Sequence, residues 1–538
     1  MGKNMFPAVY IYDTTLRDGA QGEGISLSVS DKIRIAARLD QLGVHYIEGG
    51  WPASNPKDLE FFHRMQKHPL KKAKLTAFTS TCRPGQPAEE DFNLTAVLDA
   101  GVTAATIVGK SWDFHVTEAL QTTLEENLRM VRDSVGFLKR KGLEVIFDAE
   151  HFFDGFKYNP AYALEVVRAA SEAGADWICL CDTNGGSMPW EVKEIVERVA
   201  REVPAPLAIH AHNDGGLAAA NTLMAVQAGA RQVQGTINGY GERCGNANLC
   251  TVIPNLQLKL NYQCLLPEEL KRLTEISHFV SEIANMPHQS QQPFVGHAAF
   301  AHKGGIHVSA VMKNSGTYEH IDPEAVGNKR RILVSELSGI SNLKHKAQEF
   351  GLNVSELTEE GRRAVEYIKQ LEHQGYQYEG ADASLELLLR RAFTDYRDYF
   401  QLEKVKIIVD KRGEEDFTAE AIVKVRVNDL VVHTAAEGNG PVNAMDNALR
   451  KALSQLYPCI REFHLTDYKV RVVDETEGTA ARVRVLIETS DASSTWSTVG
   501  VSENIIEASF QALVDSFNYA LLKRKPEVPV SAGEQRRD

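Results

Sequence analysis

Short apolar runs alternate with longer segments of helical period from residue 8 to about residue 260. The apolar runs predict strands at Val9–Tyr12, His45–Ile47, Leu75–Thr79, Thr103–Val108, Leu143–Asp148, Trp177–Cys181, Leu207–His210 and Gln232–Ile237. The periodic segments predict helices at Asp31–Leu42, Glu118–Lys139, Tyr162–Ala173, Trp190–Glu202 and Leu217–Ala228. A glycine follows several of these segments, which is a common position for a helix cap.

This alternation predicts an α/β fold. Eight strand–helix units over about 250 residues are what a (β/α)8 barrel requires, so we expect residues 1–265 to form a catalytic barrel. A doubly wound parallel sheet is the main alternative. No Gly-x-Gly-x-x-Gly motif follows the first strand, which disfavours that alternative.

The pattern changes twice in the second half of the chain. Between residues 266 and 400 the strand signal disappears, and helical periods at Glu268–Ala284, Thr358–His373 and Ala383–Asp398 predict a helical linker arm. This arm contains a glycine-rich segment with His302, followed by Tyr318. Exposed histidines in such a loop are also common without any function.

Residues 401–525 contain a β-β-β-α pattern used twice. Strands are expected at Val405–Val409, Glu420–Val427, Val431–Ala435, Tyr468–Val473, Ala481–Glu488 and Ser494–Gly500, with helices at Val442–Leu456 and Ile505–Leu522. We expect a small duplicated α+β domain that packs against a copy of itself. The charged, proline-containing tail at 526–538 is expected to be disordered.

Composition and charge limit the function classes. Of the 538 residues, 43% are hydrophobic and 24% are charged, as in ordinary globular proteins with a large core. The net charge of −13 disfavours a non-specific nucleic-acid binder. No apolar run is long enough to span a membrane, and the first seven residues carry no apolar signal core. We therefore expect a cytoplasmic protein with no membrane partner and, from its charge, no nucleic-acid partner. Seven cysteines without a Cys-x-x-Cys pair suit free thiols in a reducing compartment.

The first predicted strand ends in a group of polar residues. Arg17 offers a fixed fork of donors for a carboxylate or an oxyanion, and Asp18 offers hard oxygen ligands for a divalent cation. Parallel α/β folds place their chemistry at such strand ends. By itself, the segment also fits a solvated turn with a surface ion pair.

Two histidines end the seventh predicted strand. His210 and His212 are two residues apart, so both imidazoles face the same side of the strand. Together with Asp18 they form a set of three ligands with open positions, as at a catalytic metal, and Asn246 could add a carbonyl oxygen. An isolated His-x-His pair also fits core histidines, but its combination with Asp18 predicts a metal site. Oxygen and nitrogen ligands allow Mn²⁺, Mg²⁺ or Zn²⁺.

These segments resemble a known enzyme family. The pattern Leu16-Arg17-Asp18-Gly19-x-Gln21 with Lys32, and the pattern Leu207-x-x-His210-x-His212-Asn213-Asp214-x-Gly216-x-Ala218, are similar to the two signatures of the 2-isopropylmalate, homocitrate and citramalate synthases. Glu48 completes the Asp-Arg-Glu set of the larger metal-dependent barrel superfamily. The resemblance covers the whole chain, and segments 50–56 and 148–155 look most like the citramalate branch. Ala20 departs from the pattern, because many relatives carry Glu there.

The resemblance implies an acyltransferase that converts acyl to alkyl on transfer. It implies a Claisen-type condensation of acetyl-CoA with a 2-oxo acid, pyruvate in the citramalate branch, followed by thioester hydrolysis. The expected metal ligands are Asp18, His210, His212 and Asn246. The expected substrate-binding residues are Arg17, Gln21, Glu48 and Thr183, and the expected catalytic residues are Arg17, Glu150, His302 and Tyr318.

Within these roles, Arg17 stabilises the developing alkoxide and Glu150 removes a proton from the acetyl methyl group. Glu150 could instead only position a ligand, and Thr183 could only cap a helix. The duplicated domain suggests a homodimer or a higher homo-oligomer. Its resemblance to the family's regulatory domain implies isoleucine as the effector, and a purely structural dimerisation domain is the alternative.

Three other functions remain open at this stage. A 2-isopropylmalate or homocitrate synthase would use the same chemistry with a larger oxo-acid pocket. A catalytically silent amino-acid-binding regulatory protein would keep the scaffold, but the intact arginine, carboxylate and histidine pattern speaks against it. A lyase of the same superfamily would not need the duplicated domain.

Overall fold

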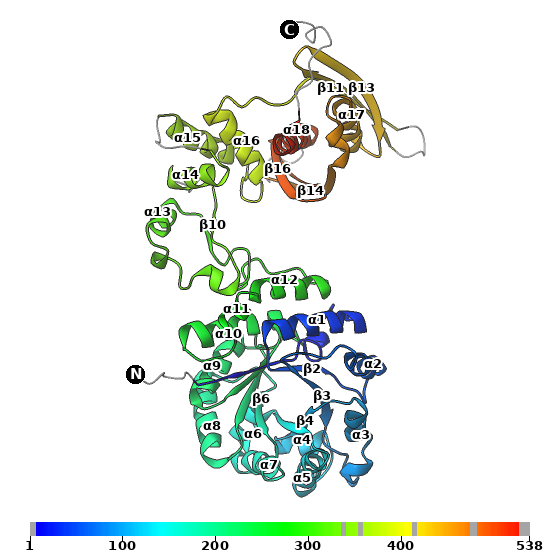
Figure 1. Cartoon of the computed structure of the whole chain (residues 1–538), viewed down its shortest axis with the longest axis vertical. Helices are drawn as coiled ribbons and strands as arrows, with labels where there is room; N and C mark the ends of the chain where they lie inside the picture. Colours follow the sequence, from blue (N-terminus) through cyan, green and yellow to red (C-terminus); the bar gives the residue numbers. More distant parts are fainter. Residues whose placement is uncertain (1–6, 335–339, 353–358, 412–416, 474–480, 527–538) are drawn as a thin grey trace. The chain divides into compact units, whose positions relative to one another are not determined.

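The computed structural model describes residues 7–334, 340–352, 359–411, 417–473 and 481–526 (Figure 1). The chain forms two compact units, one of residues 1–300 and 320–330 and the other of residues 301–319 and 331–538. The segment 266–400, expected as one linker, contributes residues to both units. No helix of the described residues is long and apolar enough to cross a membrane.

The first unit is a closed barrel of eight parallel strands, which confirms the predicted (β/α)8 architecture. In order these are β1 (Tyr10–Asp13), β2 (Tyr46–Gly50), β3 (Lys74–Ser80), β4 (Ala104–Lys110), β5 (Glu144–Glu150), β6 (Trp177–Asp182), β7 (Leu207–Ala211) and β8 (Gln232–Gly235). Strand β1 closes the barrel by pairing with β8, Tyr10 opposite Gln232 and Asp13 opposite Gly235. Closure brings the two ends of the Tyr10–Gly235 segment together, because the first and last strands become neighbours.

Helices surround the barrel (Figure 1). They are α1 (Val29–Leu42), α2 (Pro56–Met65), α3 (Phe92–Asp99), α4 (Asp113–Glu118), α5 (Leu124–Arg140), α6 (Phe152–Tyr158), α7 (Pro160–Glu172), α8 (Pro189–Glu202), α9 (Ala218–Ala228), α10 (Leu249–Pro254), α11 (Pro267–Leu270) and α12 (Leu273–Ile283). Helix α1 begins with a capping box between Ser28 and Asp31 and ends at Gly43, whose φ of 88° favours glycine. Short helical turns are η1 (Gly19–Gln21), η2 (Ala88–Glu90), η3 (Ile237–Gly239), η4 (Asn255–Lys259) and η6 (Pro323–Val326).

Alternation along the strands separates two apolar clusters. Ile11, Ile47 and Ile209 belong to the large core between the sheet and its helices. Their strand neighbours Tyr12, Tyr46 and Ala208 belong to a smaller cluster with Ile146, Trp177, Cys179 and Cys181. Since successive side chains of a strand face opposite sides, the second cluster fills the barrel interior. The interior is therefore a packed core, and chemistry is confined to the strand ends.

Several predicted elements of the first unit were wrong in detail. The helix expected from Glu118 to Lys139 begins only at Leu124, as α5, because Gln121 has a φ of 54° and Thr123 caps α5. The expected helix Glu268–Ala284 is divided into α11 and α12. The last strand ends at Gly235 instead of residue 237, because the chain turns there into η3.

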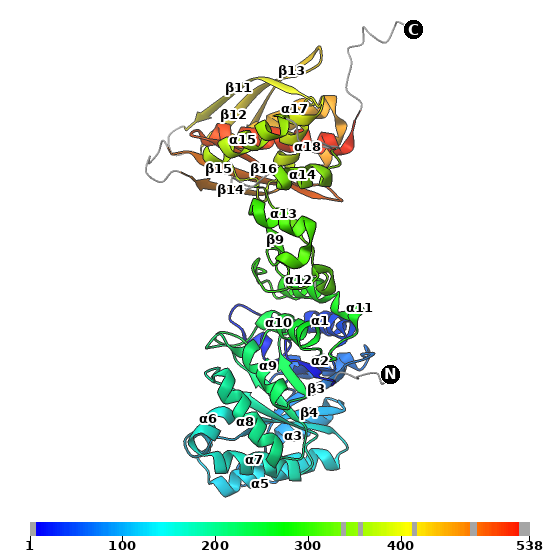
Figure 2. The ribbon, with the colours of Figure 1, turned by 90° about the vertical axis from the view of Figure 1, so that its left-hand side faces the viewer.

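The second unit contains the duplicated domain. The first repeat is β11 (Gln401–Asp410), β12 (Thr418–Val427), β13 (Leu430–Gly438) and α17 (Pro441–Leu456), and the second is β14 (His464–Val472), β15 (Val483–Ser490), β16 (Thr495–Ser502) and α18 (Ile505–Arg524). Each repeat forms a three-stranded antiparallel sheet with its helix packed on it, and α17 contacts α18 (Figure 2). One shared apolar core includes Leu449 and Leu513. This confirms the β-β-β-α duplication.

The rest of the second unit is mostly helical. It contains α13 (Gly305–Lys313), α14 (Ile340–Glu349), α15 (Glu359–His373), α16 (Asp382–Phe393) and the turns η5 (Ser315–Thr317) and η7 (Pro458–Glu462). The expectation that no strand occurs between residues 266 and 400 was wrong, since β9 (Ala301–His302) pairs with β10 (Arg331–Ile332). Two-residue strands are too short to leave a pattern in the sequence. The tail predicted to be disordered lies outside the described residues from 527 onward.

Candidate metal and active site

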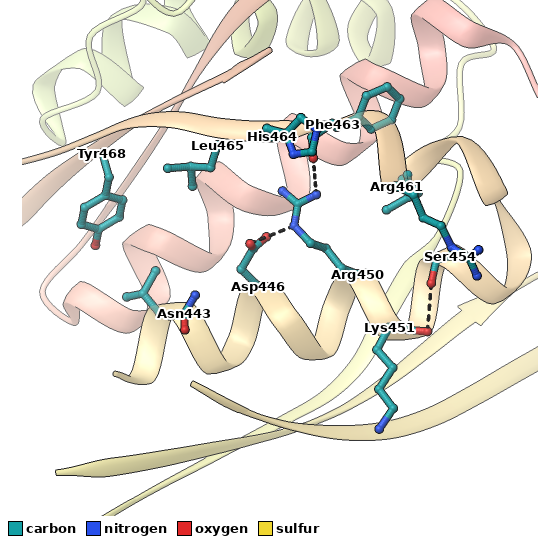
Figure 3. A pocket seen from close by; sticks show the side chains of 12 residues that line it. Asn443, Asp446, Arg450, Lys451, Ser454, Arg461, Phe463, His464, Leu465 and Tyr468 are labelled. Atoms are coloured by element: carbon teal, nitrogen blue, oxygen red, sulfur yellow. Dashed lines mark hydrogen bonds and ion pairs between the residues drawn. The ribbon is translucent and has the colours of Figure 1, made fainter. Parts of the chain in front are cut away.

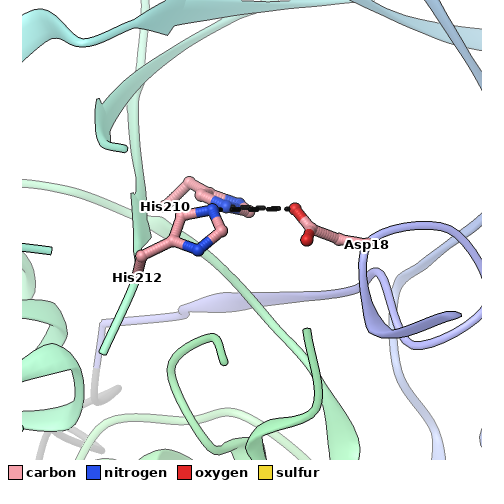
Figure 4. A group of neighbouring side chains, drawn as sticks. All are labelled: Asp18, His210 and His212. Carbon is pink, nitrogen blue, oxygen red and sulfur yellow. Dashed lines mark ion pairs between the residues drawn. The ribbon is translucent and has the colours of Figure 1, made fainter. Parts of the chain in front are cut away.

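Three buried side chains from opposite ends of the barrel sequence converge at the carboxyl ends of its strands. Asp18 follows β1, His210 lies on β7 and His212 directly follows β7 (Figure 4). The Asp18 Oδ2 atom lies 3.5 Å from His210 Nε2 and 3.9 Å from His212 Nε2. One ligand atom of each residue lies within 4.8 Å of the others. This carboxylate–imidazole set suits a divalent cation.

Asn246 completes the group. Its Nδ2 donates to Asp18 Oδ1 over 3.1 Å and to the Tyr240 carbonyl over 3.0 Å, and residue 246 pairs with His212 in an isolated bridge. Among the described residues, the buried Asn246 Oδ1 has no hydrogen-bond partner. A buried acceptor without a partner is costly, and a cation would satisfy it. The residues present therefore fit the metal that the sequence predicts.

The electrostatics of the group favour the ligand forms of its members. Burial opposes the charge of Asp18, but Arg17 and the two imidazoles outweigh burial and lower the pKa of Asp18 to about 2. Burial and the neighbouring His210 lower the pKa of His212 to about 4, and burial also lowers the pKa of His210. An ionised carboxylate beside neutral imidazoles is the state in which these groups bind a metal.

A chain of buried polar groups orients His210. Its Nδ1 lies 3.0 Å from Gln234 Oε1, so the ring donates there and leaves Nε2 toward Asp18. Gln234 Nε2 in turn donates to Asp148 Oδ1 over 3.0 Å. Burial, and next the charge of Glu48, raise the pKa of Asp148 to about 7. Outer partners of this kind fix the tautomer and direction of a metal-binding histidine.

Arg17 is fixed by a second set of contacts. Its Nε donates to Glu48 Oε2 over 2.6 Å, and its guanidinium lies 4.0 Å from the centre of the Phe78 ring. Glu48 also accepts from the Tyr12 and Thr14 hydroxyls over 2.7 and 2.5 Å. Glu48 is fully buried, and its observed contacts orient Arg17. The arginine is thus preorganised beside the metal group.

Lys32, a residue of the first signature, supports the loop after β2. Its Nζ donates to the Gly49 carbonyl over 3.0 Å and to Asp58 over 2.5 Å, and Asp58 accepts from the Trp51 amide over 3.0 Å. Gly50 has a φ of 148°, and a Cβ there would lie 2.4 Å from the Asp58 carboxyl. Lys32 therefore acts on the shape of the loop.

A cleft of about 480 Å³, here called the barrel cleft, opens beside the metal group. Its lining includes Arg17, Asp18, Gln21, Thr183, His210, His212, Trp51, Phe78, Lys110 and Glu150. The hydroxyl of Thr183 accepts from the His151 amide over 2.9 Å, which leaves its own proton for donation. Glu150, at the end of β5, forms an ion pair with Lys110, at the end of β4. The barrel cleft thus holds the metal group, a carboxylate, and guanidinium, ammonium, hydroxyl and amide donors.

His302 and Tyr318 belong to the second unit. His302 Nε2 lies 3.0 Å from Glu319 Oε1, and the Tyr318 ring lies 4.3 Å from the His307 ring, centre to centre. Tyr318 is 48% exposed. Their expected catalytic roles stay predictions.

Sequence reasoning missed Lys110, Asp148 and Gln234. Gln232 and Gln234 are two residues apart on a short strand, so both side chains face the barrel interior. Two polar residues on that face could have indicated that this strand contributes to the site. Lys110 carried a weaker signal, as a charge that ends a buried strand. Its partnership with Glu150 depends on strand register, with Lys110 opposite Glu150.

The duplicated domain contains a separate cleft of about 780 Å³ between α17, η7 and β14 (Figure 3). Arg450 crosses it, donating to Asp446 over 2.9 Å and to the Phe463 carbonyl over 2.5 Å. Apolar Leu465 and Tyr468 line the same cleft. In the described part of the chain, no side chain caps the first turn of α17, whereas Asn504 caps α18 by accepting from the Ile506 amide over 2.9 Å.

Three families match successive parts of the chain. The HMGL-like family matches residues 8–280, the homocitrate synthase post-HMGL domain-like family residues 294–376, and the LeuA allosteric (dimerisation) domain residues 379–521. A curated (R)-citramalate synthase of Aquifex aeolicus is 56% identical, covering 97% of this chain and 99% of its own. One of a Synechocystis species is 53% identical over 96% of both chains. A 2-isopropylmalate synthase of Methanocaldococcus jannaschii is 32% identical, covering 97% and 96%.

Proposed function

The chain belongs to the (R)-citramalate synthase family, and from this premise we propose that it condenses acetyl-CoA with pyruvate and hydrolyses the thioester to give (R)-citramalate and CoA. The enzyme is an acyltransferase that converts acyl to alkyl on transfer. The observation that carries the proposal is the arrangement of Asp18, His210 and His212 beside Arg17 in a cleft at the barrel's carboxyl end. A 2-isopropylmalate synthase shares this chemistry, but such a relative is less similar to this chain.

Asp18, His210, His212 and Asn246 would hold a divalent metal, Mn²⁺ or Mg²⁺, with Zn²⁺ also allowed by the donor set. When bound, the metal supplies a Lewis acid for the keto group of the oxo acid. Gln234 and Asp148 hold the His210 ring in the direction that ligation needs.

Arg17 binds the oxo acid and stabilises the alkoxide that forms on its keto oxygen. The fixed position supports this role, because a donor that needs no reorganisation stabilises developing charge best. Thr183 donates its hydroxyl proton to the substrate carboxylate, and Gln21 adds an amide at the cleft wall. Glu48, expected to bind substrate, acts through Arg17 in this proposal, since Glu48 is fully buried beneath it.

Glu150 acts as the base. Its carboxylate removes a proton from the acetyl methyl group, the electrons of the C–H bond form a carbon–carbon double bond, and the thioester oxygen gains the charge. The new carbon nucleophile then attacks the keto carbon of pyruvate. The place of Glu150 on the cleft wall supports its role as the base. His302 and Tyr318 assist proton transfer or water attack in the hydrolysis step.

A substrate panel tests the proposal. CoA release is measured with pyruvate, 2-oxobutyrate, 2-oxoisovalerate and 2-oxoglutarate on the metal-loaded full chain. We expect pyruvate to give the largest kcat/KM, since each extra methylene that does not fit costs about 1–3 kcal/mol. A kcat/KM for 2-oxoisovalerate equal to that for pyruvate refutes the choice of substrate, and CoA release with none of the four refutes the enzyme class.

The second unit adds control to this activity. The LeuA allosteric domain supports a regulated homodimer or higher homo-oligomer, and isoleucine as the end product of a cytoplasmic isoleucine pathway is the proposed effector. The uncapped start of α17 offers backbone amides for its carboxylate, and Leu465 and Tyr468 offer apolar contacts for its side chain.

A further inference from the structure

Lys110 and Glu150 form an ion pair within the barrel cleft, at the carboxyl ends of two adjacent strands. Each side chain is 25% exposed, so both reach the cleft while most of their length is covered. The register places Lys110 directly opposite Glu150 in the β4–β5 ladder. The ammonium therefore lies beside the carboxylate that the proposed mechanism uses as a base.

The backbone beneath this pair is anchored on both strands. The buried Asn127 donates from Nδ2 to the Lys110 carbonyl over 2.9 Å and to the Tyr162 hydroxyl over 2.9 Å. The Ser111 hydroxyl donates to the Glu150 carbonyl over 2.7 Å. These hydrogen bonds fix the backbone positions of Lys110 and Glu150. The long, flexible side chain of Lys110 still allows its ammonium group to move.

The amino ends of β3 and β5 carry a comparable pair that does not line the cleft. Lys74 of β3 forms an ion pair with Glu144 of β5, and the Lys74 side chain is 51% exposed. A pair with one side chain in solvent contributes little to stability. It shows what a structural lysine–glutamate pair looks like in this barrel, and Lys110 differs from it by facing the space where substrates bind.

The proposed chemistry places one negative charge on two different oxygens in turn. The charge forms on the thioester oxygen when Glu150 removes the methyl proton. It then passes to the keto oxygen of the oxo acid, where Arg17 and the metal group lie. Arg17 is held by Glu48 and Asp18, at 2.6 and 3.2 Å, on the side of the metal group. The thioester oxygen needs its own donor, close to Glu150.

We infer that Lys110 is a catalytic residue whose ammonium leaves Glu150 and donates to the thioester oxygen of acetyl-CoA as the enolate forms. The proton passes from the methyl carbon to the Glu150 carboxylate, the C–H electrons form the carbon–carbon double bond, and the charge on the thioester oxygen is held by the Lys110 N–H. When the double bond attacks the keto carbon, the thioester carbonyl re-forms and that contact weakens again. This role rests on the proposed function.

Lys110→Met, Lys110→Arg and Lys74→Met variants of the metal-loaded full chain test it. Methionine keeps the length of the side chain and removes its charge. The first readout is exchange of the acetyl-CoA methyl protons with deuterated solvent, followed by mass spectrometry, beside CoA release with pyruvate. We expect Lys110→Met to lower both rates by about 100-fold or more, as the loss of an oxyanion donor does, and Lys110→Arg to recover most of the loss. Lys74→Met is expected to match the wild type.

A binding measurement separates catalysis from mere support of Glu150. Two CoA derivatives are compared by calorimetry in the presence of pyruvate, one with a carboxylate in place of the enolate and one with the neutral amide of the same shape. We expect Lys110→Met to weaken the carboxylate derivative by about 10-fold or more and the amide derivative much less, because only the former needs a cation. Equal effects on both derivatives, or wild-type exchange in Lys110→Met, overturn the inference. A wild-type chain that releases CoA with none of the 2-oxo acids overturns the proposed function instead.

Discussion

Replacing Gln234 by leucine is expected to weaken metal binding without unfolding the barrel. The change removes the acceptor for the His210 Nδ1 proton at 3.0 Å and the donor to Asp148 at 3.0 Å. The His210 ring then loses the contact that fixes its tautomer and direction. Loss of such an outer partner typically costs 10- to 100-fold in metal affinity, or about 1.4 to 2.8 kcal/mol.

The assay is a titration of metal-free full chain with Mn²⁺, in which the free ion is followed by electron paramagnetic resonance. Gln232→Leu is the matched control. Gln232 lies on the same strand and the same face, is fully buried, and neither of its amide atoms has a hydrogen-bond partner among the described residues. It should keep wild-type Mn²⁺ affinity. If Gln234→Leu also binds Mn²⁺ as tightly as the wild type, then Gln234 does not hold His210 for ligation.

Three other outcomes are expected. CoA release should be abolished by exhaustive chelation of the metal or by the His212→Ala substitution, while thermal unfolding stays cooperative. Full turnover in either case contradicts the metal site. Burial raises the pKa of Asp13 in the folded protein to about 7, whereas an aspartate of the unfolded chain has a pKa of about 3.9. The protonated carboxyl therefore stabilises the fold fully below pH 4. This contribution to the free energy of unfolding is lost as the pH rises to 7, by up to about 4 kcal/mol. Asp13→Asn should remove this loss in urea unfolding measured at pH 5 and pH 8, and an unchanged difference between the two pH values contradicts it. Isoleucine should lower turnover without competing with pyruvate, through a coupling free energy of about 1–3 kcal/mol between the two sites. Gly440→Ala should weaken this inhibition, and its Cβ would meet open space. Purely competitive inhibition by isoleucine refutes the regulatory site.

The sequence predicted the barrel well because its strands are buried on both faces and stand out as apolar runs. The errors follow from local exceptions. Strand β2 was expected to end at Ile47 but continues to Gly50, because glycine there allows the backbone to approach Asp58 closely. The break between α4 and α5 depends on the positive φ of Gln121, which no periodicity reveals.

Sequence reasoning found the metal ligands Asp18, His210 and His212, but it missed partners that lie on neighbouring strands. His210 and His212 are two residues apart, so strand alternation alone places them together. The pairs Lys110 with Glu150 and His210 with Gln234 join different strands. Such partners are set by register, which the closed sheet fixes and the linear pattern does not.

Barrel closure also determines when the metal site can exist. Asp18 and Asn246, which share a hydrogen bond, are 228 positions apart in the chain. A nascent chain that has not yet exposed the segment after β8 can offer the histidines or the carboxylate, but not the complete ligand set. A cation that binds the complete set therefore favours the closed barrel over every partly assembled form, by mass action. In a cell, the supply of metal would thus influence the closure of the barrel during folding and the lifetime of the finished barrel, as well as its turnover.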